Sequence, residues 1–188
     1  MKRSAFSAAV SVVIMIAMLT ACGAPAEVIP QPTFTPLGEA PEVPPAVAID
    51  GTPVTASYYE WIIDREPVTF KAAEDQDDVV LPTVFSDDAN AITVEVGSPV
   101  TPADFVVVVF DEIDPSGKPV ESSAQTIDCL RDADRCTVVT ADAAVSATVD
   151  ARRSSDAIVV VHLMYVSDAR DEQQVDHVVG AWGARVGT

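Results

Sequence analysis

A period-two alternation of apolar and polar residues is the feature that most restricts what this chain can fold into. In one run, the β-branched apolar residues Ile92, Val94 and Val96 occupy every second position, and the sequence Gly-Ser-Pro then ends the run. In the stretch 54–63, Tyr59, Trp61 and Ile63 likewise share one face. Because successive side chains of a strand point to opposite faces, this pattern predicts half-buried β-strands.

The unbroken apolar run 105–110 is rich in valine and short for a helix, so we expect a buried central strand there. The run 158–166, which is interrupted only by His162, predicts a second strand of this kind. Residues 137–149 alternate in part and predict a strand, with a short alanine-containing helix as the alternative. The last run, 175–186, predicts a final strand in which Gly180 and Gly183 flank Trp182. Such glycines indicate a bulge or a close backbone approach.

Polar turn signals separate these runs at residues 64–67, 86–90, 115–117, 152–156 and 167–171. About seven short strands with this spacing predict a mainly β fold, an antiparallel β-sandwich. The expected architecture is similar to that of immunoglobulin-like modules. The Cys…Trp…Cys pattern of true immunoglobulin domains does not occur, so the likeness is one of architecture.

The N-terminus combines a positive start, Lys2-Arg3, with an apolar run over 5–18 and the sequence Leu19-Thr20-Ala21-Cys22. This layout is typical of a secretion signal and resembles the lipobox of bacterial lipoproteins. The resemblance covers residues 1–22 and implies lipidation of the Cys22 sulfur and cleavage before it. A membrane-spanning helix is the alternative, but the run is shorter than the roughly 20 residues that a bilayer core needs.

The resemblance also implies an extracytoplasmic protein anchored to the cell membrane by acyl chains, each buried methylene contributing about 0.8 kcal/mol. An aspartate directly after the cysteine would resemble an inner-membrane retention signal, but this chain has Gly23 there. A Gram-negative source would therefore imply the outer membrane. Seven prolines follow between positions 25 and 45. We therefore expect a signal peptide at 1–21, a disordered proline-rich linker with the lipidated cysteine at 22–46, and a β-sandwich domain at 47–188.

Cys129 and Cys136 remain as an even pair once Cys22 is lipidated, in a compartment that permits disulfides. Their spacing predicts a disulfide that closes a small loop across a hairpin or turn, with a stabilisation of about 2 to 3 kcal/mol. Metal ligation is the alternative, but neither His162 nor His177 has suitable spacing. The loop carries charges of both signs, and we regard it as a candidate binding surface: Arg131, Asp132, Asp134 and Arg135.

The chain has a formal net charge of −18, which becomes −20 once the leader and its two cations are removed. A chain this acidic repels nucleic acid, which binds through Lys and Arg. Three acidic clusters, 74–78, 87–90 and 111–114, are interpreted as solvated loops. Calcium ligation is the alternative, although none matches a calcium-loop motif. We expect no cofactor.

No G-x-S-x-G, H-E-x-x-H, phosphate-binding loop or dinucleotide motif occurs in the sequence. His162 and His177 are interpreted as hydrogen-bonded residues in or beside a sheet, and Ser154 and Ser155 as turn residues. We expect a non-enzymatic lipoprotein whose domain binds an envelope protein or a small ligand. A structural envelope subunit and a small hydrolase are the alternatives. Polar loops clustered at one end would favour the binding protein, and a broad exposed apolar patch would favour the structural subunit. A deep pocket that contains a histidine would favour the hydrolase.

Overall fold

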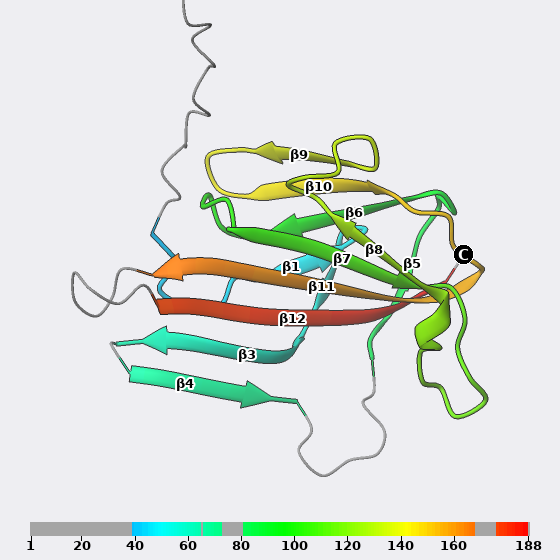
Figure 1. Cartoon of the computed structure of the whole chain (residues 1–188), viewed down its shortest axis with the longest axis horizontal. Coiled ribbons are helices and arrows are strands. Elements are labelled where there is room, and N and C mark those ends of the chain that lie inside the picture. Colours follow the sequence, from blue (N-terminus) through cyan, green and yellow to red (C-terminus); the bar gives the residue numbers. More distant parts are fainter. Residues whose placement is uncertain (1–38, 65, 73–80, 168–175, 188) are drawn as a thin grey trace, which may run out of the picture. The chain divides into compact units, whose positions relative to one another are not determined.

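The computed structural model describes residues 39–64, 66–72, 81–167 and 176–187, which belong to one compact unit. These residues form two β-sheets (Figure 1). Sheet A contains, in spatial order, β2 (Thr52–Val54), β1 (Val47–Ile49), β6 (Ala91–Val96), β10 (Val145–Asp150) and β9 (Cys136–Thr140). All neighbouring strands of sheet A are antiparallel.

Sheet B contains, in spatial order, β4 (Glu66–Lys71), β3 (Ala56–Ile63), β12 (Asp176–Gly187), β11 (Asp156–Ser167), β7 (Asp104–Phe110) and β8 (Ala124–Asp128). A further strand, β5 (Thr83–Phe85), pairs in parallel with the end of β12. A 3-10 turn, η1 (Glu121–Ser123), precedes β8. The predicted mainly β fold with two packed antiparallel sheets is confirmed.

The core lies between the two sheets and is built by alternate residues of their strands. In β6, the three predicted core residues are fully buried: Ile92, Val94 and Val96. In β7, Phe105, Val107 and Val109 are also fully buried, while the residues between them are half-buried on the other face of sheet B. The apolar run 105–110 is therefore an inner strand of its sheet, as predicted, with one face in the core.

Two tryptophans anchor this core. Trp61 of β3 is buried, and its indole meets the ring of Tyr165 edge-on at a centroid distance of 5.7 Å. Trp182 of β12 is buried as well, and its ring lies over Gly180: a Cβ at Gly180 would lie 2.5 Å from Cη2 of the indole. The register of β12 against β3 shifts between Ala181 and Trp182. The register shift fits the expected bulge, whereas the close approach at Gly180 is made by a side chain and not by a neighbouring backbone.

A tight hairpin joins β1 to β2 at the edge of sheet A. Asp50 and Gly51 both have positive φ, 46° and 73°, as a type I′ turn requires. The Asp50 carboxylate accepts a hydrogen bond from the backbone N–H of Thr93, at 2.8 Å, which fastens the turn to β6.

The end of the proline-rich segment contacts the domain. The indole Nε1 of Trp61 donates to the carbonyl of Pro41 at 2.8 Å, and the N–H of Ala40 donates to the carbonyl of Val166. At the other end, the carbonyl of Ala46 accepts from Gly97. Residues 40–46 thus run along the sandwich before β1 begins. The predicted signal peptide and most of the predicted linker, residues 1–38, lie outside the described residues, and the domain boundaries stay predictions.

The strands predicted at 92–96, 105–110, 158–166 and 175–186 correspond to β6, β7, β11 and β12. The stretch 137–149 contains two strands, β9 and β10, so the strand interpretation is confirmed there. The described chain has more strands than the roughly seven expected. Strands β1, β2 and β5 have three residues each and carry too short a pattern, and β4 and β8 were not predicted either. The turn predicted at 167–171 falls almost entirely outside the described residues.

Candidate functional site

The disulfide between Cys129 and Cys136 joins the two sheets of the sandwich. Cys129 directly follows β8 of sheet B, and Cys136 begins β9 of sheet A. Both cysteines are buried, with 4% of each exposed, and their Cα atoms are 5.0 Å apart. The predicted disulfide is present, but it connects edge strands of different sheets and not the two arms of a hairpin.

The loop over residues 130–135 is built on backbone hydrogen bonds that begin at Asp128. The carbonyl of Asp128 accepts from the N–H groups of Arg131 and Asp132, and its carboxylate accepts from the N–H of Leu130. The carbonyl of Asp132 then accepts from Arg135 and Cys136. Two consecutive turns therefore define the course of the loop before the disulfide closes it.

Arg131 fastens the loop to sheet B. Its guanidinium Nη1 donates to Asp104 Oδ1, at 3.1 Å, and to Asp128 Oδ2. The bond to Asp128, followed by the one to Asp104, raises the pKa of Arg131 further above its usual value. The side chain is 69% exposed, so solvent and salt screen these ion pairs and they orient the loop more than they stabilise the fold.

Arg135 fastens the loop across the gap between the sheets. Its Nη2 donates to Gln125 Oε1 of β8, at 3.2 Å, and lies 3.4 Å from the carbonyl of Asp150 in β10. The carbonyl of Arg135 in turn accepts from the N–H of Asp150 at 2.7 Å. One residue thus contacts a strand of each sheet.

The four charged residues predicted in the loop therefore divide into two groups. Arg131 and Arg135 point back to the domain, and Asp132 contributes its carbonyl to the turn. Asp134 is exposed at the tip and has no hydrogen bond or ion pair within the described chain. Leu130, which is 38% exposed, lies in the same loop and was missed because a lone leucine gives no signal in sequence.

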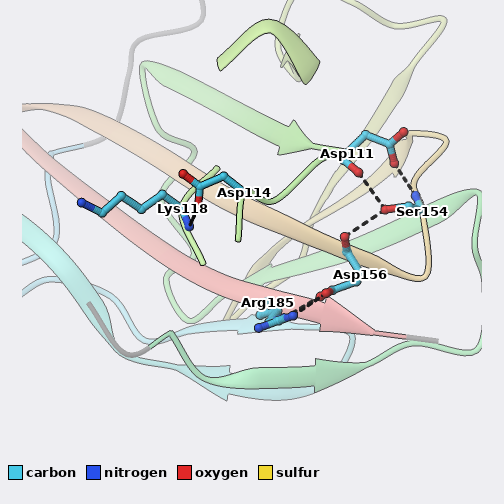
Figure 2. A network of polar contacts seen from close by, with 6 residues as sticks. All are labelled: Asp111, Asp114, Lys118, Ser154, Asp156 and Arg185. Atoms are coloured by element: carbon cyan, nitrogen blue, oxygen red, sulfur yellow. Dashed lines mark hydrogen bonds and ion pairs between the residues drawn. The ribbon is translucent and has the colours of Figure 1, made fainter. Parts of the chain in front are cut away.

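The acidic cluster 111–114 is engaged by neighbouring chain segments (Figure 2). The Asp111 carboxylate accepts from the N–H of Ser154, and the Ser154 hydroxyl lies 2.8 Å from the carbonyl of Asp111 and 2.9 Å from that of Asp156. A hydroxyl has one proton, so it bonds one carbonyl at a time. Ser154 therefore links the segment before β11 to the residues that follow β7.

Two further acids in Figure 2 are held by specific partners. Asp114 Oδ1 accepts from the Ser116 hydroxyl and from the backbone N–H groups of Ser116 and Lys118, and these bonds lower the pKa of Asp114. Asp156 pairs with both Nε and Nη2 of Arg185, which lowers the pKa of Asp156. Both carboxylates have a structural use, in a turn and in a link between β11 and β12.

The acids at 87–88 line an open hollow of about 440 Å³ together with Asp50, Thr93 and the exposed ring of Phe85. Behind them, the buried Arg153 donates to the carbonyl of Asp88. Within the described residues, no three His, Cys, Asp or Glu side chains are grouped so that they could hold a metal ion. The cluster at 74–78 lies outside those residues.

His162 lies on the solvent-facing side of β11, where its cross-strand neighbours are Val106 of β7 and Ala181 of β12. This partly apolar surrounding disfavours the charged imidazolium and lowers the pKa of His162. His177 of β12 is exposed and lines a separate, half-open hollow of about 180 Å³ with Glu60 and Thr69. The two histidines are thus at different places on sheet B.

Neither a protein-family model nor a curated protein gives a significant match to this chain. The described residues include no helix long and apolar enough to cross a membrane.

Proposed function

We propose that this protein is a membrane-anchored lipoprotein of the bacterial cell envelope whose β-sandwich binds a protein or a ligand through the loop 130–135, without catalysis. The observation that carries the proposal is the Cys129–Cys136 disulfide at the base of an exposed loop. A structural disulfide of this kind persists in oxidising compartments, which is where the lipobox at Cys22 would deliver the chain.

The construction of the loop supports a role in recognition. A disulfide, two turns and two arginines hold the backbone, so little conformational entropy is lost when a partner binds. Leu130 is 38% exposed, and the Asp134 carboxylate has no hydrogen bond or ion pair with a described residue, so both side chains can contact a partner. An apolar and an anionic group on a rigid loop suit a partner that presents an apolar surface beside a cation.

The first test concerns the anchor. The full chain and its Cys22→Ala variant are expressed in a bacterium fed with a labelled fatty acid, and cells are then fractionated. We expect label and membrane association in the full chain and loss of both in the variant, because the thiol that carries the lipid is gone. A full chain that is unlabelled would contradict the lipoprotein proposal.

The second test concerns the loop. The intact anchored protein is cross-linked and captured from its own membranes in three forms: the parent chain, Asp134→Lys and Glu121→Lys. The control changes charge equally at an exposed residue of η1, at the far end of β8 from the loop. We expect Asp134→Lys to reduce the amount of captured partner at least about ten-fold, which corresponds to 1.4 kcal/mol. We expect Glu121→Lys to capture as much partner as the parent chain. Equal capture by both variants would contradict a binding role for the loop.

A further inference from the structure

Strand β9 forms a free edge of sheet A. It pairs with β10 on one side, and it is the last strand of the sheet on the other (Figure 1). Its sequence, Cys136–Thr140, contains no charged residue and no proline. Val139 is 59% exposed on the outer face, whereas Val138 packs against the core.

The hydrogen bonds at its two ends show which backbone groups of β9 point outward. Ala141 N–H donates to the carbonyl of Ala144, and Asp150 N–H donates to that of Arg135. Since bonded pairs alternate along an antiparallel ladder, Thr137 and Val139 bond to β10, while Val138 and Thr140 direct their N–H and C=O groups away from it. No described residue bonds to these four groups.

The other edge strands of the described chain each carry a feature that hinders pairing with a further strand. Strands β2 and β5 have three residues each, and β2 includes Pro53. Strand β4 carries Glu66, Pro67 and Lys71. In β8, the Asp128 carbonyl is occupied by the loop 130–135, and the Ala124 N–H by Glu121. Short strands, charges and prolines are the usual means of blocking edge-to-edge pairing, and β9 has none of them.

We propose that β9 is the seam of a homodimer in which it pairs antiparallel with β9 of a second copy, with Val139 opposite Val139. This inference is independent of the proposed recognition role of the loop 130–135. The two sheets A would join into one continuous sheet across a two-fold axis, as a symmetric interface between identical chains requires.

The free groups themselves select the register. With Val139 opposite its copy, Val138 faces Thr140 of the second copy and Thr140 faces Val138, so all four outward groups of each chain are bonded. A shift that places Val138 opposite its copy would require the Cys136 N–H, which already donates to Asp132. The proposed register therefore uses the free groups and leaves the loop intact.

The side chains fit the same register. The two Val139 side chains meet at a non-bonded pair, the closest cross-strand position, and cover each other's exposed surface.

A cysteine at the centre of the seam tests the proposal. The full chain carrying Val139→Cys is oxidised in the expressing cells, and disulfide-linked dimer is measured on non-reducing gels. We expect a dimer, because Val139 and its copy lie within disulfide reach. The parent chain retains Cys22, Cys129 and Cys136 and reports any dimer that these form. Thr137→Cys is the matched control: the same register separates Thr137 from its copy by about 14 Å along the strands.

Stronger cross-linking from Thr137→Cys than from Val139→Cys would overturn the register. Cross-linking of Val139→Cys to another protein in place of a second copy would overturn the homodimer, as would the absence of any product above the parent chain.

Sedimentation of the purified full chain in detergent provides a measurement without added thiols. Val139→Lys would place two like charges face to face, so we expect it to reduce the dimer fraction at least several-fold. Val43→Lys is the matched control, since Val43 is 56% exposed and precedes β1, three strands away from β9 in sheet A. Equal dimer fractions in the two variants would contradict the proposal.

Discussion

Single residues set the packing of β12, because the indole of Trp182 lies directly over Gly180. A Cβ at Gly180 would approach indole atoms to 2.5 and 2.7 Å, and the Trp182 ring that would have to shift is buried. We expect Gly180→Ala to lower the free energy of unfolding by about 1 to 3 kcal/mol, the range for overpacked cores. Denaturant unfolding of the purified protein measures this change.

Gly97→Ala is the control for that variant. Its Cβ would come no closer than 3.4 Å to the carbonyl of Ala46, and Gly97 is exposed. We expect a change within about 0.5 kcal/mol. If both alanines destabilised the protein equally, the contact with Trp182 would not be the cause.

At the scale of single residues, the imidazole of His162 makes the stability of the fold depend on pH. Its pKa is lowered in the folded state from the ordinary value of 6.5, so between the two values the unfolded chain binds a proton that the native state does not. Stability is therefore highest above pH 6.5 and falls as the pH drops through the lower pKa. The effect is small, since the imidazole is partly solvated.

We expect the difference in stability between the parent protein and His162→Gln to widen in favour of the parent as the pH rises from about 5 to 7. Thermal unfolding at several pH values measures that difference, and an NMR titration of the His162 ring should give a midpoint below 6.5. A constant difference over this range would show that folding leaves the His162 pKa unchanged.

At the scale of elements, the disulfide links β8 to β9 and hence one sheet to the other. Replacing both cysteines by serine should cost about 2 to 3 kcal/mol, because the short cross-link no longer restricts the unfolded chain. Hydrogen exchange of β9 amides should accelerate most, since within its own chain β9 has a neighbouring strand on one side alone. Reduction of the parent protein should reproduce the loss, and unchanged unfolding of the reduced protein would contradict this account.

Alternation predicted the longer strands because their buried faces follow period two over six or more residues, as in β6 and β7. The hairpin β1–β2 was missed although Asp50-Gly51 is a strong type I′ signal. Strand β4 was missed because Glu66-Pro67 indicated a turn. Proline is tolerated there, since β4 is an edge strand whose outward N–H groups need no ladder partner.

The candidate site was predictable only where its contacts are local in the sequence. The pairing of Cys129 with Cys136 follows from local spacing, and Asp128 lies next to the loop. The contact of Arg131 with Asp104 depends on β8 lying beside β7, and that of Arg135 with Asp150 on β10 lying beside β9. Sheet order is a property of the whole fold, and no local pattern in the sequence encodes it.

At the scale of the whole molecule, charge opposes compactness. The chain has 29 acidic residues against 11 basic ones, and folding brings these charges together. Specific pairs such as Arg131 with Asp104 and Arg185 with Asp156 act in the opposite direction, but they are exposed. Repulsion among the unpaired carboxylates should therefore dominate the long-range electrostatics.

We accordingly expect added salt to stabilise the folded protein, because it shortens the screening length from roughly 30 Å at 0.01 M to a few ångströms near 1 M. A gain on the order of 1 kcal/mol would raise Tm by roughly 2 to 4 °C for a chain of this size.

Sodium chloride and choline chloride should act equally if screening is the cause, whereas an effect of sodium alone would indicate cation binding. The same screening should increase pairing through β9, since two acidic copies repel each other. A fall in stability with either salt would mean that the ion pairs outweigh the repulsion.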